Sequence, residues 1–153
     1  MRAYRLAKAR YADVCLDGSG AKSYGGRWNS KGVAMVYASD TVSLAALELL
    51  AHLHRSEVLN RYLLLSVDLP DAGVMTLDET AIPADWRADP PPASTAAIGD
   101  EWVAEATSLA LSVPSALVPR QWNILINPAH PAFQEAKRTV TTEPFDFDPR
   151  LAR

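Results

Sequence analysis

The residues of this chain that can do chemistry begin in a short segment with two glycines and an arginine. Residues 25–29 read Gly-Gly-Arg-Trp-Asn, Tyr37 ends a short apolar run, and Glu48 lies in a leucine-rich segment. Paired glycines let the backbone approach a ligand closely, and an arginine beside them can bind phosphate through parallel hydrogen bonds. An arginine, a tyrosine and a carboxylate are the groups needed to hold a dinucleotide and to attack its glycosidic bond.

Glu48 occupies an unusual place for a carboxylate. Ser39 and Asp40 are good helix N-caps, and they predict a helix that continues to about Arg55. The apolar face of this helix is made by three residues at i, i+3 and i+7: Leu44, Leu47 and Ala51. Glu48 lies on or beside that face because it follows Leu44 by four residues. Burial there costs several kcal/mol unless the carboxylate finds partners or a solvent-filled pocket.

Each of these residues also has a purely structural interpretation. Arg27 and Arg5 can be surface or salt-bridged arginines, and Tyr37 can be an ordinary core residue of a strand. Glu48 can pair with one of the arginines, or it can make a weak contact with His52 at i+4. The sequence leaves these alternatives open.

Three further polar residues lie in two short apolar segments with prolines at their ends. Ser115 follows Pro114, and Asn123 and Asn127 begin and end the run Asn-Ile-Leu-Ile-Asn. The asparagines can simply satisfy local backbone groups in turns, and a lone serine is too common to indicate a site.

The elements that must position these residues alternate without a regular βαβ rhythm, which favours a single α+β domain over residues 1–153. A loop is predicted at residues 17–20, and a surface loop at residues 83–95, where three prolines are consecutive. Strands are predicted at residues 4–6, 33–38, 61–69, 74–77, 113–119, 123–128 and 145–148, and further helices at 99–111 and 131–138.

Composition narrows the class of protein. The net charge is -3, whereas a nucleic-acid-binding face is expected to be basic, so we expect no direct binding to nucleic acid. The single cysteine, Cys15, excludes an internal disulfide, fits a reducing compartment, and is best read as a small buried apolar residue. There is neither a signal-peptide core nor a membrane-spanning run, so we expect a cytoplasmic protein.

The sequence predicts no metal site. His52 and His54 are two residues apart and diverge on a helix, and His130 has no potential ligand near it in sequence. The chain also lacks a P-loop, a dinucleotide-binding glycine fingerprint, and the GxSxG and HExxH motifs.

Six segments together resemble the RES domain family, which is named after characteristic arginine, glutamate and serine residues. Their order is that of the family and they span nearly the whole chain, the Gly-Gly-Arg-Trp-Asn segment being the most specific. The six are Tyr4-Arg5, residues 25–29, Tyr37-Ala38-Ser39, Ala46-Leu47-Glu48, Val113-Pro114-Ser115 and residues 123–128.

The resemblance implies a toxin of a bacterial type II toxin–antitoxin pair with an ADP-ribosyltransferase-like fold, a mixed, mainly antiparallel sheet flanked by helices. Such toxins destroy NAD by hydrolysis or phosphorolysis, and some members are reported to modify a protein instead. The implied partner is an Xre-like antitoxin with a helix-turn-helix region that blocks the active site, in a larger oligomer. DNA contact then belongs to the complex. A non-catalytic binding module of similar fold remains a third reading.

The resemblance also implies roles for particular residues. Glu48 would stabilise the positive charge that develops on the ribose as the nicotinamide–ribose bond breaks. Arg5 and Arg27 would bind the pyrophosphate and the adjacent ribose. The remaining candidates are Tyr37 to stack on a ring of NAD, Ser115 to bind a ribose hydroxyl or the nicotinamide amide, Asn127 to hold the loop that carries Ser115, and Trp28 as a stacking platform or as packing under the glycine turn. The acceptor of the ADP-ribosyl group is left open, as is the role of residues 83–95 in partner contact or gating.

Overall fold

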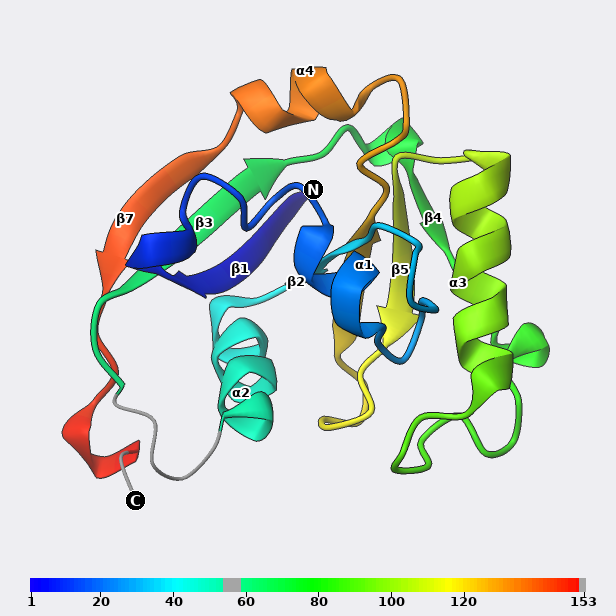
Figure 1. Cartoon of the computed structure of the whole chain (residues 1–153), viewed down its shortest axis with the longest axis horizontal. Helices are drawn as coiled ribbons and strands as arrows, with labels where there is room; N and C mark the ends of the chain where they lie inside the picture. The colour runs from blue at the N-terminus through cyan, green and yellow to red at the C-terminus, as the bar shows by residue number, and fades with distance from the viewer. Residues whose placement is uncertain (54–58, 152–153) are drawn as a thin grey trace.

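A seven-stranded sheet runs through the protein (Figure 1). The computed structural model describes residues 1–53 and 59–151, and its strands follow the order β4-β5-β6-β2-β1-β3-β7. Neighbouring strands are antiparallel, except that β4 and β5 are parallel. The predicted α+β class with a mixed, mainly antiparallel sheet is therefore confirmed. The strands are β1 (Arg2–Lys8), β2 (Val36–Ser39), β3 (Tyr62–Asp68), β4 (Val74–Thr76), β5 (Ala110–Pro114), β6 (Trp122–Ile126) and β7 (Thr141–Phe145).

One face of the sheet carries a core cluster that is covered from two places along the chain. Side chains alternate between the faces of a strand, and Ala3, Val36 and Ile124 all point to this face. Phe133 of α4 (Phe133–Arg138) and Cys15, in the segment after β1, pack on them. Cys15 is buried, as predicted.

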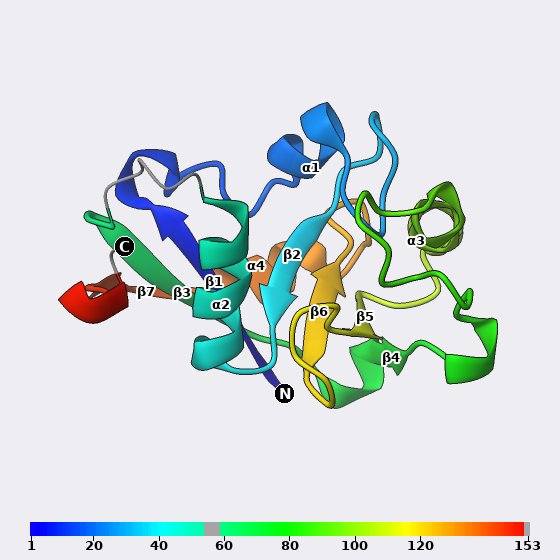
Figure 2. The ribbon, with the colours of Figure 1, turned by 90° about the horizontal axis from the view of Figure 1, so that it is seen from below.

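The other face is covered by two helices that lie apart. Trp102 of α3 (Ala93–Glu105) packs with Leu125 of β6, whereas Leu50 of α2 (Val42–His52) packs with Leu6 of β1. In both views, β2 and β6 lie between α2 and α3 (Figures 1 and 2). The side chains that β2 and β6 present on this face therefore lie between the two helices. No helix of the described residues is long and apolar enough to cross a membrane.

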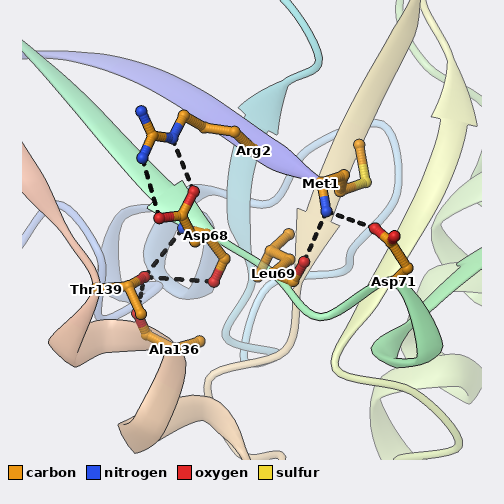
Figure 3. Close-up of polar contacts among 7 residues, drawn as sticks. All are labelled: Met1, Arg2, Asp68, Leu69, Asp71, Ala136 and Thr139. Atoms are coloured by element: carbon orange, nitrogen blue, oxygen red, sulfur yellow. Dashed lines mark hydrogen bonds and ion pairs between the residues drawn. The ribbon is translucent and has the colours of Figure 1, made fainter.

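Polar contacts fasten the start of β1 to the end of β3, and the end of β3 to the end of α4 (Figure 3). The Arg2 guanidinium donates to both Asp68 carboxylate oxygens, at 2.7 and 3.0 Å, and holds the pKa of that carboxyl below its usual range. These groups are exposed to water, so the pair contributes little to stability. The other contacts join the Met1 amine to Leu69 and Asp71, and Thr139 to Asp68 and Ala136.

The helix that carries Glu48 starts later than predicted. Its N-cap is Thr41, whose hydroxyl accepts a hydrogen bond from the Leu44 N–H at 3.2 Å. Ser39, a predicted cap, is instead the last residue of β2, where it pairs with Asn123. The helix is delayed because pairing between β2 and β6 continues through Ser39, so the assignment of Ser39 and Asp40 as caps was wrong.

The apolar face of α2 also differs from the prediction. Leu44 and Ala45 are buried, but Leu47 is 46% exposed. The buried stripe is therefore rotated away from Leu47, toward β1 and β2, which α2 contacts. Arg55, the predicted end of the helix, lies outside the described residues.

The next helix was predicted at residues 99–111, and this was wrong at both ends. α3 begins directly after Pro92 and ends at Glu105, and the next residue, Ala106, has a left-handed conformation with φ 49°. Leu111 belongs to β5. An alanine rarely adopts positive φ, so no recognisable stop signal precedes the apolar residues of the following strand.

The remaining element boundaries agree with the prediction in some places and differ from it in others. The loop predicted at residues 83–95 ends at Pro92, since Thr95 is fully buried within α3. α1 (Ser19–Tyr24) falls partly where a loop was predicted, after Gly18 with φ 75°. β7 precedes the strand predicted at residues 145–148, whereas β1, β3, β4 and α4 lie where strands and a helix were predicted, and β2, β5 and β6 overlap their predicted segments.

Close contact between α3 and the Gly-Gly-Arg-Trp-Asn segment gives a testable prediction. A Cβ atom on Gly99 would lie 1.8 Å from the backbone oxygen of Trp28, so Gly99→Ala forces the helix away from that segment. We expect it to lower the free energy of unfolding by about 3 kcal/mol, measured from urea unfolding. Gly20→Ala in α1 is the control, because a Cβ there meets nothing within 4 Å. Equal midpoints for Gly99→Ala and the native chain would contradict this packing.

Candidate active site

The carboxylate of Glu48 is held by two residues that lie far away in sequence. Its Oε1 atom accepts a hydrogen bond from the Ser115 hydroxyl at 2.9 Å and another from the Asn123 Nδ2 group at 2.5 Å. Glu48 lies in α2, Asn123 in β6, and Ser115 directly after β5. The two donors satisfy one oxygen of a half-buried carboxylate, and three separate segments meet at it.

The hydrogen bonds continue on both sides of the carboxylate. The Ser39 hydroxyl donates to Asn123 Oδ1 at 2.9 Å. Ser115 Oγ accepts from the backbone N–H groups of Leu117 and Val118, each at 3.2 Å. Because the backbone amides occupy the lone pairs of Ser115 Oγ, its single proton is free to point at Glu48.

The alternatives considered for Glu48 are not what the structure shows. Ion pairs among the described residues do not involve Glu48, so no arginine of residues 1–53 and 59–151 neutralises it directly. His52 lies near it in α2, but the His52 Nδ1 atom is 2.7 Å from the backbone oxygen of Glu48 and not from its carboxylate.

Asn29 holds the Gly-Gly-Arg-Trp-Asn segment in place. Its Nδ2 group donates to three backbone oxygens, those of Ala21, Ser30 and Val33, at 2.9, 3.1 and 3.0 Å. Its Oδ1 atom accepts from the Tyr37 hydroxyl at 2.7 Å. Asn29 is 1% exposed, so this buried amide is fully satisfied and fixes the turn.

Tyr37 links this segment to β2. Its hydroxyl also accepts from the Trp28 N–H at 3.0 Å, and burial raises the pKa of Tyr37 well above its usual range. The phenol therefore stays neutral and is no general base. A Cβ on Gly26 would lie 2.6 Å from the Tyr37 oxygen, so the second glycine is required for close approach.

Arg27 binds the proline-rich loop. Its Nη1 group donates to the backbone oxygens of Trp86 and of Ala88, the latter at 3.0 Å, and the Trp86 ring is 6.4 Å from the ring of Trp28. From the same stretch of loop, Arg87 donates to the backbone oxygen of Ala116 at 2.8 Å. Residues 86–88 therefore connect the Gly-Gly-Arg-Trp-Asn segment with the turn that follows Ser115.

Arg5 lies on the opposite face of β1 from this network, with Ala3 and Ala7. Its Nη1 group donates to the Tyr37 backbone oxygen at 2.5 Å, and its buried Nε atom has no hydrogen-bond partner among the described residues. Burial lowers the pKa of Arg5. Since β1 and β2 share the single register pair Tyr4–Ser39, the Arg5 side chain bridges the two strands where they separate.

Asn127 is also apart from Glu48. It is fully buried; its Nδ2 group donates to the Val103 backbone oxygen at 3.1 Å, and its Oδ1 atom accepts from the Ala129 N–H at 2.9 Å. These contacts tie the end of β6 to α3. The loop that carries Ser115 lies at the other end of the β5–β6 hairpin, where the Ser115 N–H donates to the Gln121 oxygen, so Asn127 does not hold that loop.

Comparison with known proteins agrees with this arrangement of segments. The RES domain family matches residues 2–148. A protein named Toxin Res, from Yersinia enterocolitica, is 44% identical over 151 residues, which are 99% of this chain and 99% of the relative. The chain belongs to the RES domain family.

A second relative of this RES domain is a protein of Sphingobium named Prs ADP-ribosylating toxin, 40% identical over 143 residues, 90% of this chain and 87% of the relative. Among solved structures, the M. tuberculosis MbcT–MbcA toxin–antitoxin complex contains a chain that superposes with a TM-score of 0.72. It is 20% identical and the match covers 99% of this chain and 86% of that one, so it supports the fold. The RES domain described here is thus a member of a family of toxins.

Sequence reasoning missed two residues of the network. Ser39 was taken as a helix cap and Asn123 as a turn residue. The available signal was strand alternation: Asn123 has the same parity as Leu125, and Ser39 the same parity as Tyr37. Both are polar positions that share a sheet face with apolar residues such as Leu125.

The Arg27 contacts generate a prediction about the loop. Arg27→Ala removes both hydrogen bonds to residues 86–88, and we expect trypsin to cleave after Arg87 roughly tenfold faster than in the native chain, because bonds from a charged donor restrain this backbone. Cleavage after the exposed Arg10 is the internal standard, and Lys31→Ala, which removes a cation from the same region, is the matched control. Equal cleavage after Arg87 in all three proteins would show that Arg27 does not restrain the loop.

Proposed function

We propose that this RES domain degrades NAD by cleaving the bond between nicotinamide and ribose, through hydrolysis or phosphorolysis. The observation that carries the proposal is the Glu48 carboxylate, which accepts hydrogen bonds from Ser115 and Asn123 and lacks an ion-pair partner among the described residues. A fixed anion of this kind is suited to stabilise a cation that forms during a reaction.

The chemistry requires such an anion. The bond between ribose C1′ and the nicotinamide ring nitrogen breaks, and its electron pair stays with the nitrogen, so the charged ring leaves as neutral nicotinamide. Positive charge then develops on the ribose, as in the cleavage of other glycosides. An oxygen of water or phosphate forms the new bond to C1′, and an attacking water gives up a proton to the solvent.

The remaining residues are proposed to bind the substrate. Arg27 would bind the pyrophosphate after exchanging its contacts with the backbone of residues 86–88 for phosphate oxygens, a stronger pair for a guanidinium. Tyr37 would offer ring surface. Trp28 is 2% exposed and packs in the core with Met35 and Trp102, and Ser115 is 3% exposed with its hydroxyl bonded to Glu48, so for these two a contact with NAD remains a prediction. For Arg5 a phosphate contact remains a prediction, since in the structure it binds the Tyr37 backbone.

A second activity is favoured by one comparison. The Sphingobium relative is named as an ADP-ribosylating toxin, so the alternative is that a protein side chain attacks C1′ and keeps the ADP-ribose. Both activities release nicotinamide and use the same Glu48 role. They differ in where the ADP-ribosyl group ends.

We further propose that the chain is a cytoplasmic toxin whose partner is an antitoxin with an Xre-like helix-turn-helix region, in a larger oligomer. The structural neighbour is itself a toxin–antitoxin complex, which supports an antitoxin partner. The net charge of -3 fits an arrangement in which the antitoxin contacts DNA.

The deciding experiment is product analysis of NAD incubated with the chain and with Glu48→Gln. Glutamine keeps the size and the accepting oxygen but removes the charge, so we expect nicotinamide release to fall at least about 100-fold with folding retained. Glu101→Gln, at an exposed position of α3, is the matched control.

Free ADP-ribose, or its phosphorylated form when phosphate is present, would identify hydrolysis or phosphorolysis. Label from NAD on a protein would identify the alternative. Full nicotinamide release by Glu48→Gln would refute the role of Glu48, and no release by the native chain would refute both activities.

A further inference from the structure

Two residues connect the Glu48 carboxylate to the centre of the sheet. Asn123 donates to Glu48 from β6, a strand paired on one side with β2 and on the other with β5. Ser39 lies directly opposite Asn123 in the β2–β6 register and donates to its Oδ1 atom. Ser39 is 3% exposed, so its hydroxyl must be satisfied within the protein.

We propose that Asn123, oriented by Ser39, is a positioning residue that sets the side-chain conformation of Glu48 for the reaction. This inference rests on the proposed cleavage of NAD. It assigns to Asn123 and Ser39 a function that acts through Glu48.

Only one orientation of the Asn123 side-chain amide satisfies its hydrogen bonds with both Glu48 and Ser39. An ionised carboxylate only accepts, so it requires the Nδ2 end of the Asn123 amide. The Oδ1 end then faces Ser39, whose hydroxyl has a proton to donate. If the amide turned over, its oxygen would face the Glu48 oxygen, and two acceptors would meet 2.5 Å apart. Ser39 therefore helps to select the amide orientation that suits a charged Glu48.

The placement explains why this support is needed. Glu48 lies on a helix that contacts only part of the sheet, and Ser115 lies in the turn after β5. Asn123 is the partner that belongs to a strand with neighbours on both sides, which is the more rigid kind of support. Asn123 therefore holds the Glu48 carboxylate at a fixed position relative to the sheet.

The test compares Asn123→Asp, Asn123→Leu, Ser39→Ala and the double variant Ser39→Ala/Asn123→Leu, with the rate of nicotinamide release measured against NAD concentration. Asn123→Asp keeps the shape of the side chain but replaces the donor with a second carboxylate oxygen. Ser66→Ala is the matched control, since Ser66 is a buried serine in β3 outside this network. Urea unfolding of every variant checks the fold, and Asn123→Ser replaces the leucine variant if that one does not fold.

We expect both Asn123 variants to lower kcat roughly 10- to 100-fold while KM for NAD stays within about twofold, because orientation acts on the reacting geometry. Ser39→Ala should lower kcat roughly three- to tenfold in the native chain and should have no further effect when Asn123 is already leucine. Ser66→Ala should leave kcat unchanged.

Three results would overturn the proposal. Near-native kcat of Asn123→Asp would show that shape alone matters. Independent, multiplicative effects of Ser39→Ala and Asn123→Leu would show that Ser39 does not act through Asn123. A loss confined to KM would make Asn123 a substrate contact.

A measurement without substrate separates this proposal from the proposed reaction. The side-chain amide signal of Asn123 in a ¹⁵N NMR spectrum, assigned as the signal missing from Asn123→Leu, should move in both Ser39→Ala and Glu48→Gln and stay in place in Ser66→Ala. An unmoved signal refutes the positioning role even if NAD is cleaved. A moved signal with no nicotinamide release by the native chain refutes the reaction alone.

Discussion

The candidate site depends on a carboxylate that, within the described part of the chain, is held by hydrogen bonds instead of by an opposite charge. Placing Glu48 on the sheet-facing side of α2 would destabilise the protein if the carboxylate lacked partners. The hydroxyl of Ser115 and the amide of Asn123 supply them. Because both donors are neutral, the negative charge is stabilised without being cancelled, and it remains able to attract a positive charge that develops nearby. A salt bridge would have satisfied the same carboxylate and removed this property.

The Gly-Gly-Arg-Trp-Asn segment and Asn123, which binds Glu48, are both attached to β2, a strand of only four residues. Tyr37 holds the Gly-Gly-Arg-Trp-Asn segment through Asn29 and the Trp28 N–H, and Ser39, two residues on, holds Asn123. Their side chains share one face of the sheet, because residues two apart on a strand point the same way. The spacing between these two points of attachment on β2 is therefore set by strand geometry.

The sequence predicted what depends on local pattern and missed what depends on pairing. Glu48 was predicted as a site residue because burying a carboxylate among leucines is costly unless it has partners. The strand β3 was predicted from its long apolar run. The role of Ser39 was invisible because it requires the register between β2 and β6, residues 84 apart in sequence. The ends of α3 were missed because its stop is an alanine with positive φ, which has no sequence signature. Arg5 was predicted to bind phosphate. In the structure it lies between β1 and β2, because these two strands separate there, and no local sequence pattern predicts that separation.

The contacts of Arg27 with the proline-rich loop have an evolutionary consequence. Its partners are backbone oxygens of residues 86 and 88, and the Arg87 side chain likewise meets a backbone oxygen, that of Ala116. Every residue type provides a backbone oxygen, so positions 88 and 116 can mutate freely without loss of these bonds as long as the chain path is kept. If selection acts on the attachment of the loop, Arg27 and the loop length should be conserved among related sequences. The residue types within the loop should vary.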